Sequence, residues 1–415
     1  MKKTPAKNLQ EVNQNRNMNG FLVHALFLAL TLNFIDINTV IPNMLAEAGA
    51  TSFHLGILSA IMIGGAGFMQ LVFAGLIIPL KRKKPALLAG IYLRVVALVA
   101  MGLFLKTLTE QANWKVWAIL SLMALFSFSG AFANISYTDI MGRVIEPVRR
   151  KRLLVSKQLI SSVGVIVSAL LVKLILTALP YPLNYSMLFL LSGILLSLAT
   201  LGFWMLKETD APLTEKITLT KRFGMFTKAL KEDRNLRLYL WLLNTSGVFL
   251  STIPFLILFA RTKFEINGSL VGTFLLARMI GSLVFNILLK LFSKSEQYRP
   301  LLYLFIGLGS ATLVLALLLT SSPLLYSLVF LLSGATGAVF QIVTAGVLLE
   351  ISNDENRGIY AGLAGAGSFM NILYPILAGI LVTKLGYPVV FLLTSIYILL
   401  GLYTAKRIRC ERIAR

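Results

Sequence analysis

Long apolar stretches, each separated from the next by a short polar interval, recur along nearly the whole chain. A helix needs about 20 mainly apolar residues to cross the hydrocarbon core of a bilayer, and about twelve stretches meet this requirement. They run near residues 20–43, 54–79, 87–106, 115–139, 157–178, 186–206, 236–260, 269–292, 300–320, 325–350, 359–382 and 388–406. The pattern predicts an all-α polytopic membrane protein with twelve transmembrane helices.

Composition agrees with a membrane location. Hydrophobic residues make up 57% of the 415 residues and charged residues 13%, whereas globular proteins average about 45–50% and 25%. The single cysteine, Cys410, excludes a disulfide scaffold and a cysteine-based metal cluster. The net charge of +22 does not indicate nucleic-acid binding, because no soluble basic domain with aromatic residues for stacking is present.

The positions of lysine and arginine predict the orientation of the chain. With the N-terminus in the cytoplasm, about 31 of the 39 basic residues fall in the tails and loops on the cytoplasmic side. The opposite loops hold about five, namely Lys106, Lys115, Arg261, Lys263 and Lys384. We therefore expect an integral multi-pass protein of the cytoplasmic (inner) cell membrane, with both termini in the cytoplasm.

One long polar interval divides the chain into halves. The predicted organisation is a cytoplasmic tail over 1–19, a six-helix bundle over 20–206, a central cytoplasmic loop over 207–235, a second six-helix bundle over 236–406 and a tail over 407–415. Short matches connect the halves: 39–42 with 251–254 and 130–135 with 337–342. Gly56, Gly65 and Gln70 also match Gly272, Gly281 and Asn286 at the same spacing. These matches indicate an internal duplication.

Two six-helix halves with cytoplasmic termini and a central loop resemble the major facilitator superfamily, whose halves are parallel repeats. The loop between spans 2 and 3 in that family usually reads Gly-x-x-x-Asp-Arg-x-Gly-Arg-Arg. Residues 75–84 keep Gly75 and the basic end, Lys83 and Lys84, but have Pro79 at the acid position and Arg82 at the second glycine. The arginine of span 4 and the Gly-Pro-x-x-Gly-Gly sequence of span 5, which proton antiporters often carry, do not occur.

Polar residues recur at helical spacing in spans 1, 4, 7 and 10. Polar groups within a bilayer must face a cavity or another helix, and the resemblance implies that these four helices line the central path. The expected substrate-path residues are Asn33, Asp36, Asn134, Asn244, Arg278 and Gln341, with Tyr137, Asn371 and Tyr374 as weaker candidates. The alternative is that such stripes only allow helices to pack closely.

Charge inside the membrane gives the sharpest hypotheses, because its cost makes a functional role the default. Asp36 is the one deeply placed acid in the sequence; it could bind a proton, bind a cationic substrate group or pair with Arg278. Arg278 could instead hold an anionic substrate through its planar guanidinium. Arg94 lies on a helix that the family places peripherally, so we expect it to be a structural partner.

The loops after spans 4 and 10 occupy equivalent places and resemble the turns that form the family's cytoplasmic gate. The first has Asp139, Glu146 and Arg150, and the second has Glu350, Asp354 and Arg357. Together with Gly75, Lys81, Arg82 and Lys83 they form the expected gate. Topogenic charge alone could also explain the first loop.

Enzymatic chemistry has little support. The two histidines, His24 and His54, are too few and too far apart for a metal motif, and no Walker-type loop occurs. No catalytic residues, metal or cofactor are therefore expected. We expect a secondary active transporter, functional as a monomer, for a small polar or amphipathic organic solute that works by alternating access. Rivals are a lipid-translocating or sensor protein and a lipid-modifying enzyme; the substrate, the transport direction and a coupling proton or ion are left open.

Overall fold

The computed structural model describes residues 5–106, 113–208, 219–292, 298–352 and 356–408, and in these residues all regular structure is helical. Ten helical stretches among them are long and apolar enough to cross a membrane. One of these, Ile359–Arg407, has 49 residues, about twice the length of one span, and is broken at Gly386, where φ is 79°. It covers two of the predicted spans.

The first predicted span is not a continuous helix. Helix α1 (Pro5–Leu32) ends before Asn33, and α2 (Val40–Glu47) begins after seven non-helical residues. The polar residues Asn33 and Asp36 of this span therefore do not lie on a helix, which corrects the expectation of helical spacing in span 1. With this broken span and the double stretch at the C-terminus, the described helices are consistent with twelve spans.

Contacts between Cα atoms group the chain into two units. Unit 1 comprises Met1–Asp36, Met69–Glu110 and Ser121–Ile217, and unit 2 comprises Ile37–Phe68, Gln111–Leu120 and Thr218–Arg415. Residues 37–68 thus have their contacts with the C-terminal helices, although the sequence pattern assigns them to the N-terminal half. The predicted division into bundles at 207–235 stays a prediction.

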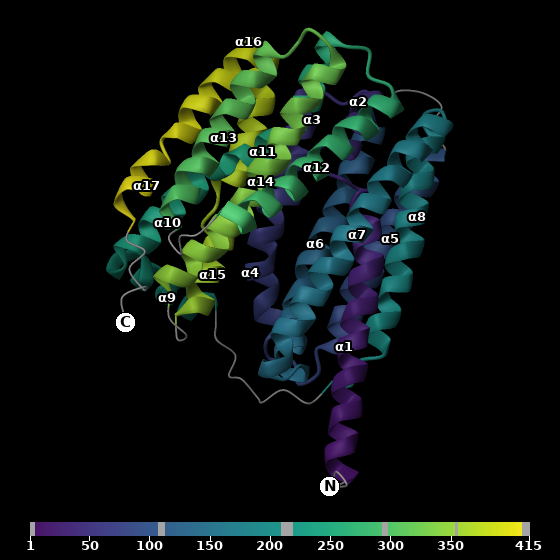
Figure 1. The fold of residues 1–415 in the computed structure, drawn as a ribbon, viewed down its shortest axis with the longest axis vertical. Helices are drawn as coiled ribbons and strands as arrows, with labels where there is room; N and C mark the ends of the chain where they lie inside the picture. The colour runs from purple at the N-terminus through teal and green to yellow at the C-terminus, as the bar shows by residue number, and fades with distance from the viewer. Residues whose placement is uncertain (1–4, 107–112, 209–218, 293–297, 353–355, 409–415) are drawn as a thin grey trace. The chain divides into compact units, whose positions relative to one another are not determined.

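Unit 1 is built from long helices packed side by side. They are α1, the end of α4 (Ala66–Ile77), α5 (Lys84–Lys106), most of α6 (Asn113–Val144), α7 (Pro147–Ala178) and α8 (Leu183–Trp204). Helix α8 lies against both α5 and α1, and α1 also packs on α7 (Figure 1). Glycines allow the closest approach: a Cβ on Gly20 or Gly202 would collide with the backbone of the other.

Unit 2 contains the remaining helices. They are α2, α3 (Ser52–Ser59), a π-helix (Ala60–Gly65), α9 (Leu219–Glu232), α10 (Arg234–Thr245), a 3₁₀ turn (Ser246–Val248), α11 (Phe249–Lys263), α12 (Gly268–Phe292), α13 (Arg299–Leu318), α14 (Pro323–Ile351), α15 (Arg357–Ala366), α16 (Met370–Leu399) and α17 (Leu402–Arg407). The closest pairs are α12 with α14 and α3 with α16 (Figure 1). Gly56 is in contact with the backbone of Pro375, so this second pair also depends on a small residue.

A polar cluster joins α2 to α11 inside unit 2. Arg261 donates from Nη1 to Oδ1 of Asn43 at 2.7 Å, and Asn43 donates to Oε1 of Glu47 at 2.7 Å. Arg261 Nη1 is also 3.7 Å from Glu47 Oε1. Asn43 is fully buried, so the amide is satisfied by two charged neighbours rather than by water. We call these three residues the α2–α11 cluster.

Candidate functional site

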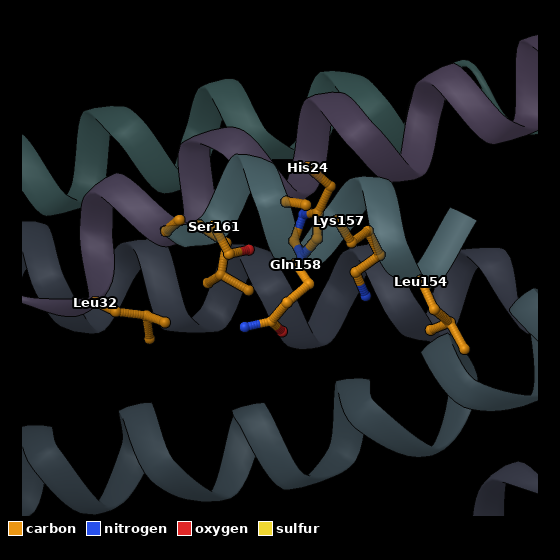
Figure 2. A pocket seen from close by; sticks show the side chains of 9 residues that line it. His24, Leu32, Leu154, Lys157, Gln158 and Ser161 are labelled. Atoms are coloured by element: carbon orange, nitrogen blue, oxygen red, sulfur yellow. The ribbon is translucent and has the colours of Figure 1, made fainter. Parts of the chain in front are cut away.

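Two adjoining hollows lie among the helices of unit 1. The larger, of about 300 Å³, is a groove between α1 and α7; its lining residues are His24, Ala25, Leu28, Ala29, Leu32, Leu154, Lys157, Gln158 and Ser161. The smaller, of about 170 Å³, lies among α1, α5, α6, α7 and α8; it is lined by His24, Leu28, Leu87, Ile91, Arg94, Gly130, Ala133, Asn134, Tyr137, Lys157 and Phe203. His24, Leu28 and Lys157 belong to both. Figure 2 shows the side chains of Lys157, Gln158 and Ser161 beside His24.

The charge of these hollows is positive. Arg94 of α5 and Lys157 of α7 line the smaller hollow, and no acidic residue lines either hollow among the residues that the structure describes. Lys157 lies ten residues after Pro147, the first residue of α7, and five residues into the apolar stretch of that helix, which begins at Arg152. Such cations within membrane helices are costly and face the protein interior or an aqueous cavity.

The position of Arg94 depends on a glycine. The guanidinium carbon lies 4.2 Å from the centroid of the Phe126 ring, a distance that allows a cation–π interaction. A Cβ on Gly130 would lie 3.2 Å from Nε of Arg94 and 3.3 Å from its Cζ. The side chain of Arg94 therefore packs directly on Gly130.

Aromatic rings form one wall of the smaller hollow. Tyr137 has its ring centroid 5.4 Å from that of Phe21 and 5.8 Å from that of Phe203, both with edge-to-face geometry. The Lys157 ammonium donates to the Tyr137 hydroxyl and lies 4.8 Å from the ring centroid. These contacts hold Tyr137 and Lys157 as a pair between α6 and α7.

His24 belongs to the same wall and is buried. Its Nδ1 lies 3.3 Å from the carbonyl oxygen of Ala199, which can only accept, so Nδ1 carries the proton. The ring lies 4.1 Å, centroid to centroid, from Phe203. In the neutral tautomer Nε2 is then an acceptor. His24 thus contributes an apolar ring face and one polar atom to the site.

Two of the predicted path residues, Asn134 and Tyr137, line the smaller hollow. Asn33 lies elsewhere: its amide donates to the Val165 carbonyl at 2.6 Å and to the Ser168 hydroxyl at 3.0 Å, so it ties the end of α1 to α7. Asp36 is buried, and its backbone N–H donates to the carbonyl of Asn33 at 3.3 Å. The roles of these four residues in a substrate path, and the Asp36–Arg278 ion pair, stay predictions.

In unit 2, Asn244 stabilises an interruption between helices. Its amide donates to the carbonyl oxygens of Leu240 and Gly367 at 2.9 and 2.7 Å, and its Oδ1 accepts from the N–H of Met370 at 3.0 Å. Gly367 and Met370 flank the break between α15 and α16. Asn244 therefore supplies hydrogen bonds that the broken helix lacks.

The remaining path candidates lie in different surroundings of unit 2. Asn371 accepts from the Ser251 hydroxyl at 3.5 Å. Tyr374 is hydrogen-bonded to Thr394, and its ring is parallel to that of Tyr397 at 6.4 Å. Gln341 is exposed on α14, and Arg278 has a buried Nε on α12. Their substrate role stays a prediction.

Two of the expected gate residues of unit 1, Lys83 and Asp139, lie together. Lys83 is 4% exposed, and its ammonium lies 3.0 Å from Oδ2 of Asp139. Arg143 lies 2.6 Å from the same oxygen and 3.0 Å from Oε1 of Glu208. Glu208 also accepts from the N–H groups of Lys83 and Lys84 at 2.7 and 2.9 Å. We call Lys83, Asp139, Arg143 and Glu208 the α5–α6 ion cluster.

Other gate candidates of unit 1 have separate contacts. Arg150 donates to the carbonyls of Gly142 and Ile145, which lie at the C-terminal end of α6 and just beyond it, where a cation is favourable. The backbone N–H of Glu146 donates to Gln14 at 3.3 Å. Lys81 and Arg82 are exposed. A Cβ on Gly75 would meet nothing within 4 Å, so packing does not require glycine there.

The gate candidates of unit 2 are less defined. Glu350 has a buried Oε2 with no hydrogen-bond partner among the described residues. Arg357 is the first residue of α15, and Asp354 lies outside the described residues. The gate itself stays a prediction.

Sequence reasoning missed Lys157, Gln158, Ser161 and Glu208. Lys157 is the first residue of the fifth predicted span, where a basic residue is explained by topology alone. Glu208 was assigned to the central loop, but it is one of only 17 acidic residues in a chain with 39 basic ones. Such a scarce acid beside a membrane span is a signal to search for basic partners.

Comparison with solved structures identifies the fold. The nucleoside transporter NupG has 14% identity and a TM-score of 0.64, with 94% of this chain and 98% of that chain covered. An auto-inhibited POT family peptide transporter has 14% identity and a TM-score of 0.67, with 96% and 98% covered. The human organic anion transporter MFSD10 has 13% identity and a TM-score of 0.61, with 94% and 99% covered.

No curated protein matches the sequence. The sequence model of the Major Facilitator Superfamily matches residues 23–294 and, in a second match, residues 238–409. The fold class that the apolar pattern predicts, and the resemblance stated from the loop and the two halves, are both confirmed. The chain is a multi-pass membrane protein that belongs to the Major Facilitator Superfamily of transporters.

Proposed function

We propose that this chain is a secondary active transporter that moves a small polar or amphipathic organic solute across the cytoplasmic membrane by alternating access. The observation that carries the proposal is the pair of hollows in unit 1, where Arg94, Asn134, Tyr137 and Lys157 meet between otherwise apolar helices. Polar side chains at this depth are expensive unless they face a pathway or a partner. Solved structures of similar fold are described as transporters of nucleosides, peptides and organic anions, which agrees with an organic solute.

Two polar clusters support alternation. With both termini in the cytoplasm, the α5–α6 ion cluster lies at the cytoplasmic side, and the α2–α11 cluster lies at the outer side. The second cluster joins a segment of the first predicted span to the seventh through Asn43, Glu47 and Arg261. Such a contact between helices of the two sequence halves is what a closed outer gate requires.

The proposal includes function as a monomer, no catalytic role and no cofactor. It leaves the coupling ion to experiment. Asp36 is the acid to test for proton coupling, because it is buried within the first span.

The experiment is solute flux into liposomes that contain the purified protein. A panel of labelled nucleosides, dipeptides and organic acids is tested with and without an imposed pH gradient, beside protein-free liposomes. We expect protein-dependent uptake of at least one solute class. Redistribution of labelled lipid without any solute flux would instead favour the lipid-translocating alternative, and product formation would favour an enzyme.

Alternating access is tested with spin-label pairs in a Cys410→Ser background. In the first variant, labelled cysteines replace Lys81 and Glu232, which are expected on the cytoplasmic side. In the second variant, labelled cysteines replace Ala178 and Lys263, which are expected on the outer side. We expect the two inter-label distances to change in opposite directions when a transported solute is added. Distances that both stay constant, while flux proceeds, would contradict the mechanism.

A further inference from the structure

The two hollows of unit 1 combine a cationic end with an apolar groove. The cationic end has Arg94 and Lys157, with the neutral polar groups of Asn134 and Tyr137 beside them. The groove has Ala25, Leu28, Ala29, Leu32 and Leu154 from α1 and α7. Since Lys157 and His24 line both spaces, the two parts form one continuous lining.

Arg94 lacks an anionic partner in the described part of the chain. Its Nε is buried with no hydrogen-bond partner among the described residues, and no described carboxylate forms an ion pair with it. The guanidinium instead lies against the face of Phe126, at 4.2 Å from the ring centroid. A guanidinium nitrogen that is buried normally has a hydrogen-bonded anion, because an unpaired polar atom away from water is costly.

Lys157 has the same kind of environment. Its hydrogen-bond partner is the phenol hydroxyl of Tyr137 and not a carboxylate. Two cations that line one hollow without a described acid raise the free energy of the empty site through mutual repulsion. An anion bound between them would remove that repulsion and accept charge-assisted hydrogen bonds from both.

We infer that this hollow binds the anionic group of an amphipathic organic anion, with Arg94 and Lys157 as its donors and the apolar groove between α1 and α7 as the place of its hydrocarbon part. The inference rests on the proposed transport function and specifies the substrate class of that site. The larger hollow, of about 300 Å³, is at the lower end of small-molecule sites, so a compact anion fits better than a large one.

The shared chemistry, an anionic head on an apolar body, also describes a lipid headgroup. The polar groups of Asn134 and Gln158 can accept or donate hydrogen bonds to either kind of ligand. We assign the site to a soluble anion because its smaller part is lined by residues of α1, α5, α6, α7 and α8 together, so the cationic end lies within the unit. The experiment has an arm that separates the two.

The test uses matched compounds of equal shape and different charge. Purified full-length protein at pH 7 is titrated with 4-phenylbutyrate, 4-phenylbutyramide and 4-phenylbutylamine, and with the same triplet built on octanoate. Melting temperature and calorimetric Kd are measured. We expect the carboxylates, ionised at this pH, to stabilise the protein by mass action, and the amides and amines to do so at least about tenfold less strongly.

Variants assign the effect to the hollow. Arg94→Gln and Lys157→Gln should each weaken the Kd for the carboxylate by about tenfold or more, since each removes a charge-assisted hydrogen bond. Arg94→Lys should weaken the Kd less than Arg94→Gln does, because lysine keeps the positive charge. Lys173→Gln is the matched control: Lys173 also lies on α7 but does not line either hollow, and its Kd should match that of the wild type.

The inference is wrong if no carboxylate stabilises the wild type more than its amide, or if Lys173→Gln weakens binding as much as Lys157→Gln. Should Arg94→Gln fail to fold, the Kd values of Lys157→Gln and Arg94→Lys for the carboxylate still test the inference. Displacement of the carboxylate by phosphatidylglycerol but not by phosphatidylcholine would overturn the assignment to a soluble anion. Flux of a neutral or cationic solute with no anion binding would refute this inference and leave the proposed transport function intact.

Discussion

The ammonium of Lys83 lies 3.0 Å from the carboxylate of Asp139, and the side chain of Lys83 is 5% exposed while that of Asp139 is 35% exposed. Lys83 therefore depends on its partner more than Asp139 does, because Asp139 keeps access to water and to Arg143. The family's loop sequence has an acid where this chain has Pro79. The acid that meets the loop lysine here comes from the end of α6 instead.

Asp139→Asn should lower the free energy of unfolding by about 3 kcal/mol, because it leaves Lys83 buried without its counter-charge. The measurement is thermal unfolding in detergent. The matched control is Glu232→Gln, which breaks an exposed pair with Lys228 at 4.0 Å, where side-chain exposures are 66% and 74%. That change should have almost no effect. Equal losses in both variants would contradict a special role for the buried lysine.

Glu208→Gln should weaken the start of α5. The carboxylate accepts from the N–H groups of Lys83 and Lys84, which lie at the N-terminal end of this helix, where a negative charge is favourable. We expect faster hydrogen–deuterium exchange over residues 83–87 and a loss of about 1–2 kcal/mol in stability. If hydrogen–deuterium exchange stayed unchanged over residues 83–87 and became faster elsewhere, Glu208 would not stabilise the start of α5.

Glu47→Gln should loosen the α2–α11 cluster. The change removes the negative charge that faces Arg261 and the strongest acceptor for Asn43. Ile41 on α2 is fully buried, so Ile41→Cys in a Cys410→Ser background reports opening. Alkylation by a membrane-impermeant maleimide should become about tenfold faster with Glu47→Gln, as the loss of a hydrogen bond to a charged group predicts. A rate that does not change would argue against a gate at this cluster.

Gly130→Ala should separate stability from binding. The added methyl would lie 3.2 Å from Nε of Arg94, so the flexible arginine side chain must shift while the helix gains about 0.5–1 kcal/mol from losing a glycine. We expect a melting temperature that is equal or higher, together with weaker stabilisation by 4-phenylbutyrate. The control is Gly307→Ala, where a Cβ meets nothing within 4 Å; it should leave binding unchanged. Unchanged binding in Gly130→Ala would contradict the placement of Arg94.

Asn244→Ala should destabilise unit 2 by about 2 kcal/mol, because the carbonyl of Gly367 and the N–H of Met370 both lose their partner. Asn134→Ala, which removes an amide of the same kind from an exposed position, should cost far less. Thermal unfolding of both variants makes the comparison. A stable Asn244→Ala variant that no longer transports solute would instead favour the substrate-path role.

The sequence could predict the helical membrane fold because crossing a bilayer imposes a length and a composition that few other structures meet. The same requirement for length and apolar composition does not reveal where a membrane helix is broken. Residues 33–39 lie inside a stretch whose length and overall apolar character suit one continuous helix, so the pattern does not separate Leu32 from Val40. Their irregular backbone depends on contacts such as that of Asn33 with Val165, 132 residues away in the sequence.

The candidate site was only half predictable for a similar reason. Asn134 and Tyr137 were found because amides and phenols in a membrane span are unusual. Lys157 was not, because a basic residue near a cytoplasmic loop has a sufficient explanation in topology. Only the packing of α7 against α1 and α6 shows that its ammonium reaches Tyr137 and joins Arg94 at one hollow.

The break between Leu32 and Val40 also falls where the chain passes from unit 1 to unit 2 at Asp36. An unbroken helix fixes every torsion along its length through its ladder of backbone hydrogen bonds. Residues 33–39 lie outside both helices, so the first span consists of two helices whose axes are set by separate contacts, those of α1 with α7 and α8 and those of α2 with α11 and α12.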